Sequence, residues 1–174
     1  MKLRDVEIYT GQRYEVPQGI QRIDSRSTHG WQLRYGGTKF YSDSKFSADP
    51  GEALKAATKE LAKRIAKLPA PTRLKPGPNG NKTSELPVGI SGPIVRQRRA
   101  NVRDCSFTVL LPRFGEAPRR RSVYIASEST YTVERYYQAL EKAVELRQEA
   151  EEAYRRAATR AKRAEMKTWL AEQA

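Results

Sequence analysis

The chain has 174 residues, a formal net charge of +13 and 38% hydrophobic residues. No apolar run approaches the roughly 20 residues of a membrane-spanning helix, and the charged residues 1–7 do not resemble the apolar stretch of a signal peptide. Cys105 and His29 are the only residues of their types, which excludes an internal disulfide and the multi-cysteine or paired-histidine metal motifs. We therefore expect a cytoplasmic protein, nucleoid-associated if it binds DNA, with no metal and no cofactor.

The positive charge is concentrated in one part of the chain. Residues 1–68 contain 13 basic and 8 acidic side chains, residues 72–126 contain 11 and 3, and residues 127–174 contain 9 of each. A surface that serves solubility intersperses the two signs, as the last segment does. The excess in the middle segment predicts a surface for a polyanionic partner.

A proline-rich stretch at residues 69–87 divides the sequence. It holds five prolines and two glycines, and proline removes a backbone donor and fixes φ, so neither a helix nor a central strand is sustained there. We expect an exposed linker between two segments, residues 18–68 and residues 88–146.

Residues 18–68 have the pattern of three strands followed by a helix. The strands are expected at residues 19–26, 31–35 and 38–42, where apolar and polar residues alternate, and Gly36-Gly37 is typical of a hairpin turn. Asp49 followed by Pro50 is typical of a helix start. The apolar stripe of that helix consists of Leu54, Ala57, Leu61, Ile65 and Leu68.

Residues 88–146 repeat this plan. Strands are expected at residues 94–99, 106–111 and 120–125, with a turn at 112–118 between the last two. Thr132 is the expected cap of a second helix, whose apolar stripe is Val133, Tyr137, Leu140 and Val144. The predicted fold class is α+β: two tandem three-stranded antiparallel sheets, each packed on one helix, with a long C-terminal helical extension.

The two ends of the chain lie outside this repeated plan. Residues 1–17 show weak alternation and receive no assignment. Residues 147–174 continue the helical pattern with interspersed Glu and Arg, which favours a solvated helix or one that packs on a partner. Trp169 and Leu170 are expected to dock on the body of the protein or fray, with a homodimer seam through this helix as the alternative.

Several short motifs of the two segments are shared with a known type of domain. They are Gly89-Ile90, the strand Trp31-Gln32-Leu33-Arg34, and the junctions between third strand and helix at residues 39–53 and 121–134. In these residues the chain resembles the plant ethylene-response-factor (Apetala-type) DNA-binding domain, and bacterial and phage proteins that carry it in tandem. The chain departs from that pattern at Phe107, where a tryptophan is expected. The resemblance implies that a sheet, and not a helix, enters the major groove of DNA.

Strand alternation predicts which side chains such a sheet presents. Gln32 and Arg34 alternate with Trp31, and Arg22 and Arg26 are expected on the same exposed face as them. Arg96 and Arg98 take the equivalent positions of the second segment. Arginine reads guanine through two parallel hydrogen bonds, and the other cations bind phosphates. The candidate DNA-binding residues are Arg22, Arg26, Gln32, Arg34, Lys39, Arg96, Arg98, Arg99, Arg103, Arg113, Arg119, Arg120 and Arg121.

The expected function is therefore sequence-specific binding of double-stranded DNA, as a transcriptional regulator or a recombination accessory. Two alternatives stay open: an RNA-binding protein, whose sign would be exposed strand aromatics, and a protein-interaction module that acts through the C-terminal helix. An enzyme is not expected, because His29 stands alone and no set of nucleophile, base and orienting group can be assembled around it.

Overall fold

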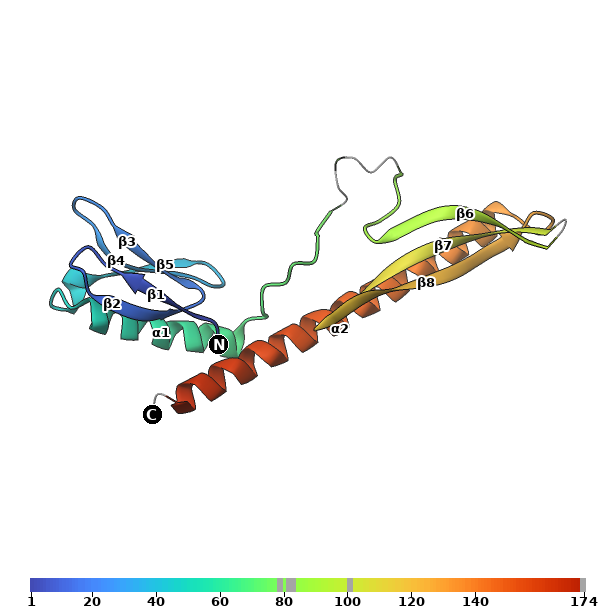
Figure 1. The fold of residues 1–174 in the computed structure, drawn as a ribbon. Helices are drawn as coiled ribbons and strands as arrows, with labels where there is room; N and C mark the ends of the chain where they lie inside the picture. The colour runs from blue at the N-terminus through green and yellow to red at the C-terminus, as the bar shows by residue number, and fades with distance from the viewer. Residues whose placement is uncertain (78–79, 81–83, 100–101, 173–174) are drawn as a thin grey trace. The chain divides into compact units, whose positions relative to one another are not determined.

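The computed structural model describes residues 1–77, 80, 84–99 and 102–172, and Figure 1 shows its elements in chain order. The fold is α+β, with antiparallel sheets of two, three and three strands, a short N-terminal helix and a long C-terminal helix. The chain divides into two compact units. The first consists of Met1–Ala70 with Thr159–Ala174, and the second of Pro71–Ala158.

The first unit combines a hairpin, a three-stranded sheet and a helix. Strand β4 is central in the sheet and pairs with β3 and β5, and all three strands lie where the alternation pattern predicts them. The elements are β1 (Leu3–Glu7), β2 (Arg13–Pro17), β3 (Ile20–Asp24), β4 (His29–Arg34), β5 (Thr38–Ser42), a 3₁₀ turn η1 (Asp43–Phe46) and α1 (Pro50–Lys67).

Helix α1 begins and ends where the sequence signals place it. The Asp49 carboxylate accepts hydrogen bonds from the backbone N–H groups of Gly51 and Glu52, which satisfies two donors that a helix start leaves free. The helix ends at Lys67, just before Pro69. Its fully buried residues are Ala53, Ala57, Leu61 and Ile65, and they share one hydrophobic core with Trp31 and Leu33 of β4.

The first core also contains residues from both ends of the chain. Ile8 and Val16, from the N-terminal segment that received no assignment, are buried in it. Met166, on the last turns of the C-terminal helix, is 4% exposed, and Trp169 packs against the same cluster. The tryptophan therefore docks on the first unit, as one of the two sequence-based expectations had it.

The second unit is a sheet of three long strands covered on one side by a helix. Strand β7 is central. The strands extend beyond their predicted limits, so the turn between β7 and β8 consists only of Phe114 and Gly115. The elements are β6 (Ile90–Arg99), β7 (Val102–Arg113), β8 (Glu116–Ser127) and α2 (Val133–Glu172). The described residues of the predicted linker, 69–77, 80 and 84–87, contain neither helix nor strand.

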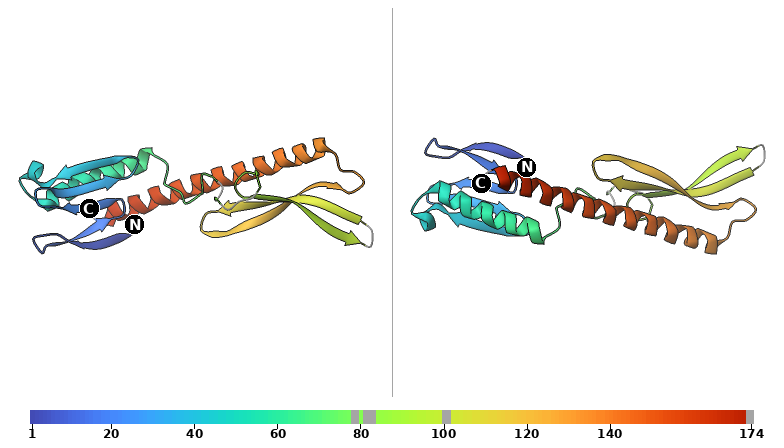
Figure 2. Two further views of the ribbon diagram at one scale, coloured as in Figure 1. Left: turned by 90° about the horizontal axis from the view of Figure 1, so that it is seen from above. Right: turned by 90° about the horizontal axis from the view of Figure 1, so that it is seen from below.

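Helix α2 lies along one face of the β6–β8 sheet (Figure 2). Its start is capped as predicted, because the Thr132 hydroxyl accepts a hydrogen bond from the backbone N–H of Arg135. The predicted apolar stripe is wrong at two positions: Val133 and Tyr137 are 60% and 62% exposed. The helix instead buries Ala139, Ala143 and Arg147. The side that meets Phe107 and Val109 is therefore centred about one residue earlier in the chain than the predicted stripe, of which Leu140 and Val144 are partly buried against the same core.

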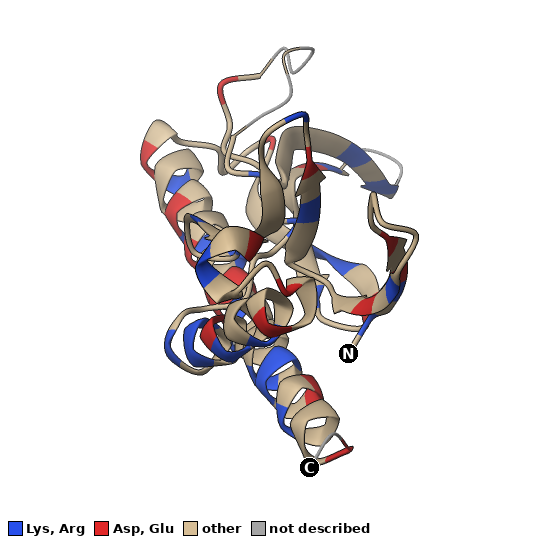
Figure 3. Ribbon diagram, turned by 90° about the vertical axis from the view of Figure 1, so that its left-hand side faces the viewer, with Lys and Arg blue, Asp and Glu red and all other residues tan. Residues whose placement is uncertain are grey.

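No helix in the described part of the chain is long and apolar enough to cross a membrane. Along α2, Lys and Arg are interspersed with Glu (Figure 3). Pairs four residues apart, such as Arg156 with Glu152 at 3.3 Å, form ion pairs on its surface. Such exposed pairs add at most about 0.5 kcal/mol each.

Candidate nucleic-acid interface

The strand register of the second unit divides its sheet into a covered and an open face. Phe107 and Val109 of β7 point toward α2 and are fully buried. Ser106 and Thr108, which alternate with them along β7, point the other way. Ser106 pairs with Ile94 and Tyr124, and Thr108 pairs with Ser91 and Ser122. We call this side, which carries Arg96, Ser106, Thr108, Arg120, Ser122 and Tyr124, the second open face.

Arg96 and Arg120 are the two cations of this face that have no acidic partner among the described residues. Arg96 comes from edge strand β6 and Arg120 from edge strand β8, and both are exposed. They line one shallow hollow of about 530 Å³, together with the hydroxyl residues Ser91, Thr108 and Ser122. These two guanidinium groups, that of Arg121, which also lines the hollow, and several hydroxyls form a surface of hydrogen-bond donors for anionic or acceptor-rich groups.

Three further arginines of the second unit are held by carboxylates. Arg98, on the same face, donates to Asp104 at 2.5 Å. Arg103 lies 3.5 Å from Glu128 and Arg113 lies 2.6 Å from Glu116. All three side chains are exposed, so these pairs are weak and can open. A nucleic acid would nevertheless have to compete with the carboxylates for them.

Arg119 and Arg121 belong to the other side of β8. The register pairs Arg119 with Leu111 and Arg121 with Val109. The two arginines therefore alternate with Arg120, and their Cβ atoms lie on the face that α2 covers. Both side chains are nevertheless exposed, and Arg121 also lines the hollow of the second open face. Arg99 ends β6, and its side chain lies outside the described residues.

The first unit has an open face of its own, formed by Gln21, Gln32, Arg34 and Phe40. Gln32 pairs with Gln21 on one side and Phe40 on the other, and the Arg34 Nε donates to the Gln32 side-chain oxygen at 2.5 Å. Phe40 lies across Gly30, where an added Cβ would meet its ring at 2.7 Å. Gln32 and Arg34 are therefore on the face that the sequence predicts, and we call it the first open face.

The predicted position of Arg22 is wrong. The register pairs Arg22 with Trp31, so its side chain lies on the helix side of the sheet, where it is only 5% exposed. Its guanidinium carbon stands 5.0 Å from the centre of the Trp31 ring. It also donates to Asp24 and, at 2.6 Å, to Asp43. Because a buried arginine needs such partners, Arg22 holds the core together and is not available to DNA.

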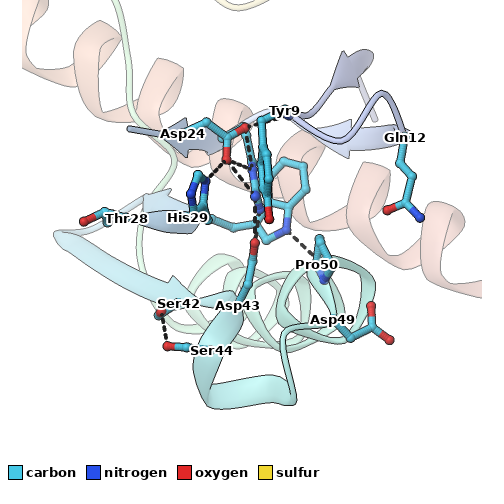
Figure 4. A network of polar contacts seen from close by, with 12 residues as sticks. Tyr9, Gln12, Asp24, Thr28, His29, Ser42, Asp43, Ser44, Asp49 and Pro50 are labelled. Atoms are coloured by element: carbon cyan, nitrogen blue, oxygen red, sulfur yellow. Dashed lines mark hydrogen bonds and ion pairs between the residues drawn. The ribbon is translucent and has the colours of Figure 1, made fainter. Parts of the chain in front are cut away.

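The acidic groups around Arg22 form a connected network (Figure 4). Asp24 accepts hydrogen bonds from Arg22 and from the backbone N–H of Tyr9, and it lies 2.9 Å from His29 Nδ1. Burial alone would raise the pKa of Asp24, but the hydrogen bonds from Arg22 and His29 outweigh it and hold that pKa below its ordinary value. The network therefore favours the charged carboxylate.

The same balance applies to Arg22 itself. Its burial alone would lower the pKa of Arg22, but the hydrogen bonds and charges of Asp43 and Asp24 raise that pKa above the ordinary value. The guanidinium thus remains charged inside the first unit. His29 stacks on Tyr9 with ring centres 4.0 Å apart.

The remaining two predicted residues of the first unit are exposed but lie away from the first open face. Arg26 is in the turn after β3, because that strand ends at Asp24 and not at residue 26. Lys39 pairs in register with Leu33, and its ammonium lies 5.2 Å from the centre of the Tyr41 ring on the helix side of the sheet.

Sequence reasoning did not select the hydroxyl residues and Tyr124 of the second open face. The signal was present, since Ser106, Thr108 and Leu110 alternate with Phe107, Val109 and Leu111 along β7. On β8, Ser122 and Tyr124 alternate with the buried Val123 and Ile125 in the same way.

Nothing in the described residues gathers three or more metal-binding side chains of the His, Cys, Asp and Glu types. Comparison of the chain with protein families, with curated proteins and with solved structures returned no match. The inference of function therefore depends on the geometry and charge of the two open faces.

Proposed function

We propose that this chain is a sequence-specific double-stranded DNA-binding protein, a transcriptional regulator or a recombination accessory, that places the second open face in the major groove. It would act without a cofactor and without catalysis. The major groove of B-DNA admits a β-sheet element, and the resemblance to the ethylene-response-factor domain implies the same mode of contact.

The observation that carries this proposal is the pair Arg96 and Arg120 on the sheet face opposite to α2. Neither has an acidic partner among the described residues, and both line the hollow that Thr108 and Ser122 share. An arginine that is free to form two parallel hydrogen bonds can recognise guanine, whereas serine and threonine hydroxyls can bind bases or phosphates. Arg96 and Arg120 are therefore better placed to hydrogen-bond to bases than Arg98, which is paired with Asp104.

One observation favours a second candidate, recognition of single-stranded RNA. Each open face carries an exposed aromatic ring: Phe40 is 38% exposed and Tyr124 is 55% exposed. Exposed aromatics on a sheet stack with unpaired bases. Arginine and hydroxyl groups outnumber aromatic rings on the second open face, and for this reason duplex DNA is the first choice.

A competition experiment separates the candidates. The full chain is bound to a labelled duplex and challenged with unlabelled duplex of varied sequence, with single-stranded RNA and with heparin, over a series of salt concentrations. We expect some duplexes to compete far better than others and better than RNA at equal phosphate concentration. Equal competition by heparin and all duplexes would reduce the function to non-specific polyanion binding, and better competition by RNA would favour the second candidate.

A further inference from the structure

A second hollow lies in the first unit, where three parts of the chain meet. The start of β1, the connection between β2 and β3, and the end of β4 form its walls. The backbone N–H of Gln18 donates to the Lys2 carbonyl, and the backbone N–H of Arg34 donates to the Gly19 carbonyl at 2.6 Å. Gly19 has a φ of +106°, in the region that favours glycine, and this turn lets β2 pass directly into β3. The hollow has a volume of about 330 Å³.

Three cations surround this hollow, and no acidic residue lines it. They are Lys2 and Arg4 from the hairpin and Arg34 from the first open face, with Gln18, Gln21 and Ile20 between them. The N-terminal hairpin thus places two positive charges beside the edge of the first open face, to which Gln21 and Arg34 belong. Like charges gather in this way where an anion is to be bound.

The two arginines are already held in place, with donors to spare. Arg4 uses one Nη to donate to the Ile20 carbonyl at 2.7 Å, and Arg34 uses its Nε to donate to Gln32. A guanidinium has five N–H donors, so the remaining ones are available without loss of these anchors. Because these two side chains are already held in place, they lose less conformational entropy when an anion binds.

We propose that the hollow bounded by Lys2, Arg4 and Arg34 binds a phosphate group of the nucleic-acid backbone, as a contact of the first unit that is separate from the second open face. Arginine forks match the oxygens of a phosphate group, and lysine adds a point charge. Leu3, which lines the hollow and is 38% exposed, offers apolar surface that suits the sugar next to that phosphate. This proposal rests on the nucleic-acid-binding function proposed above.

The test uses full-length variants with Lys2→Gln and Arg4→Gln combined, and separately Arg34→Gln, in duplex-binding measurements over a salt series. Lys59→Gln, on the exposed side of α1, is the matched control. Each phosphate contact that is lost should weaken binding of all duplexes about fivefold near physiological salt and make the log–log salt slope shallower by about 1. Thermal melts of each variant exclude a folding defect, since Arg4 also supports the Ile20 carbonyl.

The outcomes separate this proposal from the proposed function. Unchanged affinity and slope in the hollow variants, with weakened binding by Arg96→Gln and Arg120→Gln, would overturn the phosphate contact and leave DNA binding intact. Should the unmodified chain bind no duplex, inorganic phosphate is titrated against it by NMR. Saturable shifts of the Gly19, Gln21 and Arg34 amides that Arg34→Gln abolishes would then support a site for a small phosphate, and their absence would overturn the site itself.

Discussion

The Arg22 guanidinium and the Asp43 carboxylate form an ion pair at 2.6 Å in which both side chains are almost fully buried, at 5% and 7% exposure. Arg22 stands on β3 and Asp43 at the start of the 3₁₀ turn η1, 21 residues further along the chain. The pair therefore links the edge of the first sheet to the turn that leads into α1. Since both groups have little access to water, Asp43 depends on Arg22 to compensate its charge, and Arg22 depends on Asp43 and Asp24.

Replacement of Arg22 should destabilise the first unit and not merely weaken binding. Arg22→Ala leaves Asp43 buried without its partner, a loss of about 3–5 kcal/mol in the free energy of unfolding. Urea denaturation measures this loss. Arg26→Ala, at an exposed position in the adjacent turn, is the control and should stay within about 0.5 kcal/mol of the unmodified chain. Similar stabilities for the two variants would contradict the buried network.

Acid should destabilise the first unit through Asp24. The pKa of this carboxyl in the folded chain lies below its ordinary value of 3.8, so the folded state binds the proton less readily than the unfolded state. The charged carboxylate then contributes stability above about pH 5, and that contribution is lost as pH falls through 3.8 and on to the folded pKa. Asp24→Asn should remove this part of the dependence in urea denaturation at a series of pH values. Parallel curves for the two proteins would exclude the carboxylate as its source.

Strand arginines and helix arginines should differ in their effect on DNA binding. Arg96→Gln or Arg120→Gln should cost about 1–3 kcal/mol and relax the preference at one base pair, if that side chain pairs with guanine. Arg155 and Arg156 of α2 are already bound to Glu151 and Glu152 at 3.2 and 3.3 Å, so their replacement should change little. Binding titrations with matched thermal melts compare the four variants. Well-folded strand variants with full affinity beside crippled helix variants would falsify recognition through the sheet.

Duplex binding should depend steeply on salt. Residues 72–126 contain 11 basic and 3 acidic side chains, and neutralisation of about six phosphates predicts a slope near −5 in a plot of log affinity against log salt. Fluorescence anisotropy from low to physiological salt measures it. A slope shallower than about −2 would mean that few phosphates are contacted.

The order and type of the elements could be predicted from the sequence because strand and helix periods are local properties. The alternation along β4, β5 and β7 and the Asp49 and Thr132 caps each lie within a few residues. The face that Arg22 occupies is a property of strand pairing, and it could not be found locally. The alternation along β3 predicts Arg22 on the exposed face, but the pairing with Trp31 turns Arg22 inward, where Asp24 and Asp43 compensate its charge.

The N-terminal hairpin was missed for a related reason. Its turn is closed by the backbone bond from Ile8 to Gln12, around Gly11 with φ at +84°, and a Thr-Gly pair is not one of the strong hairpin signals. Ile8 and Val16 of this hairpin are buried in the first core, but residues such as Leu61 and Met166 of the same core are distant in the sequence. Lys2 and Arg4, which line the hollow of the first unit, were overlooked together with the segment that carries them.

The membership of the first core has a consequence for the order in which the chain folds during synthesis. Residues 1–70 leave the ribosome early, but Met166 and Trp169, which complete their core, follow 96 and 99 residues after Ala70. At about 5–20 residues per second this is a wait of about 5–20 s. During that wait the apolar surface around Ile8, Val16 and Ile65 stays uncovered and open to chaperones. The second unit, whose described core comes from one uninterrupted stretch of chain, can close first, so the part that is made first is the last to be finished.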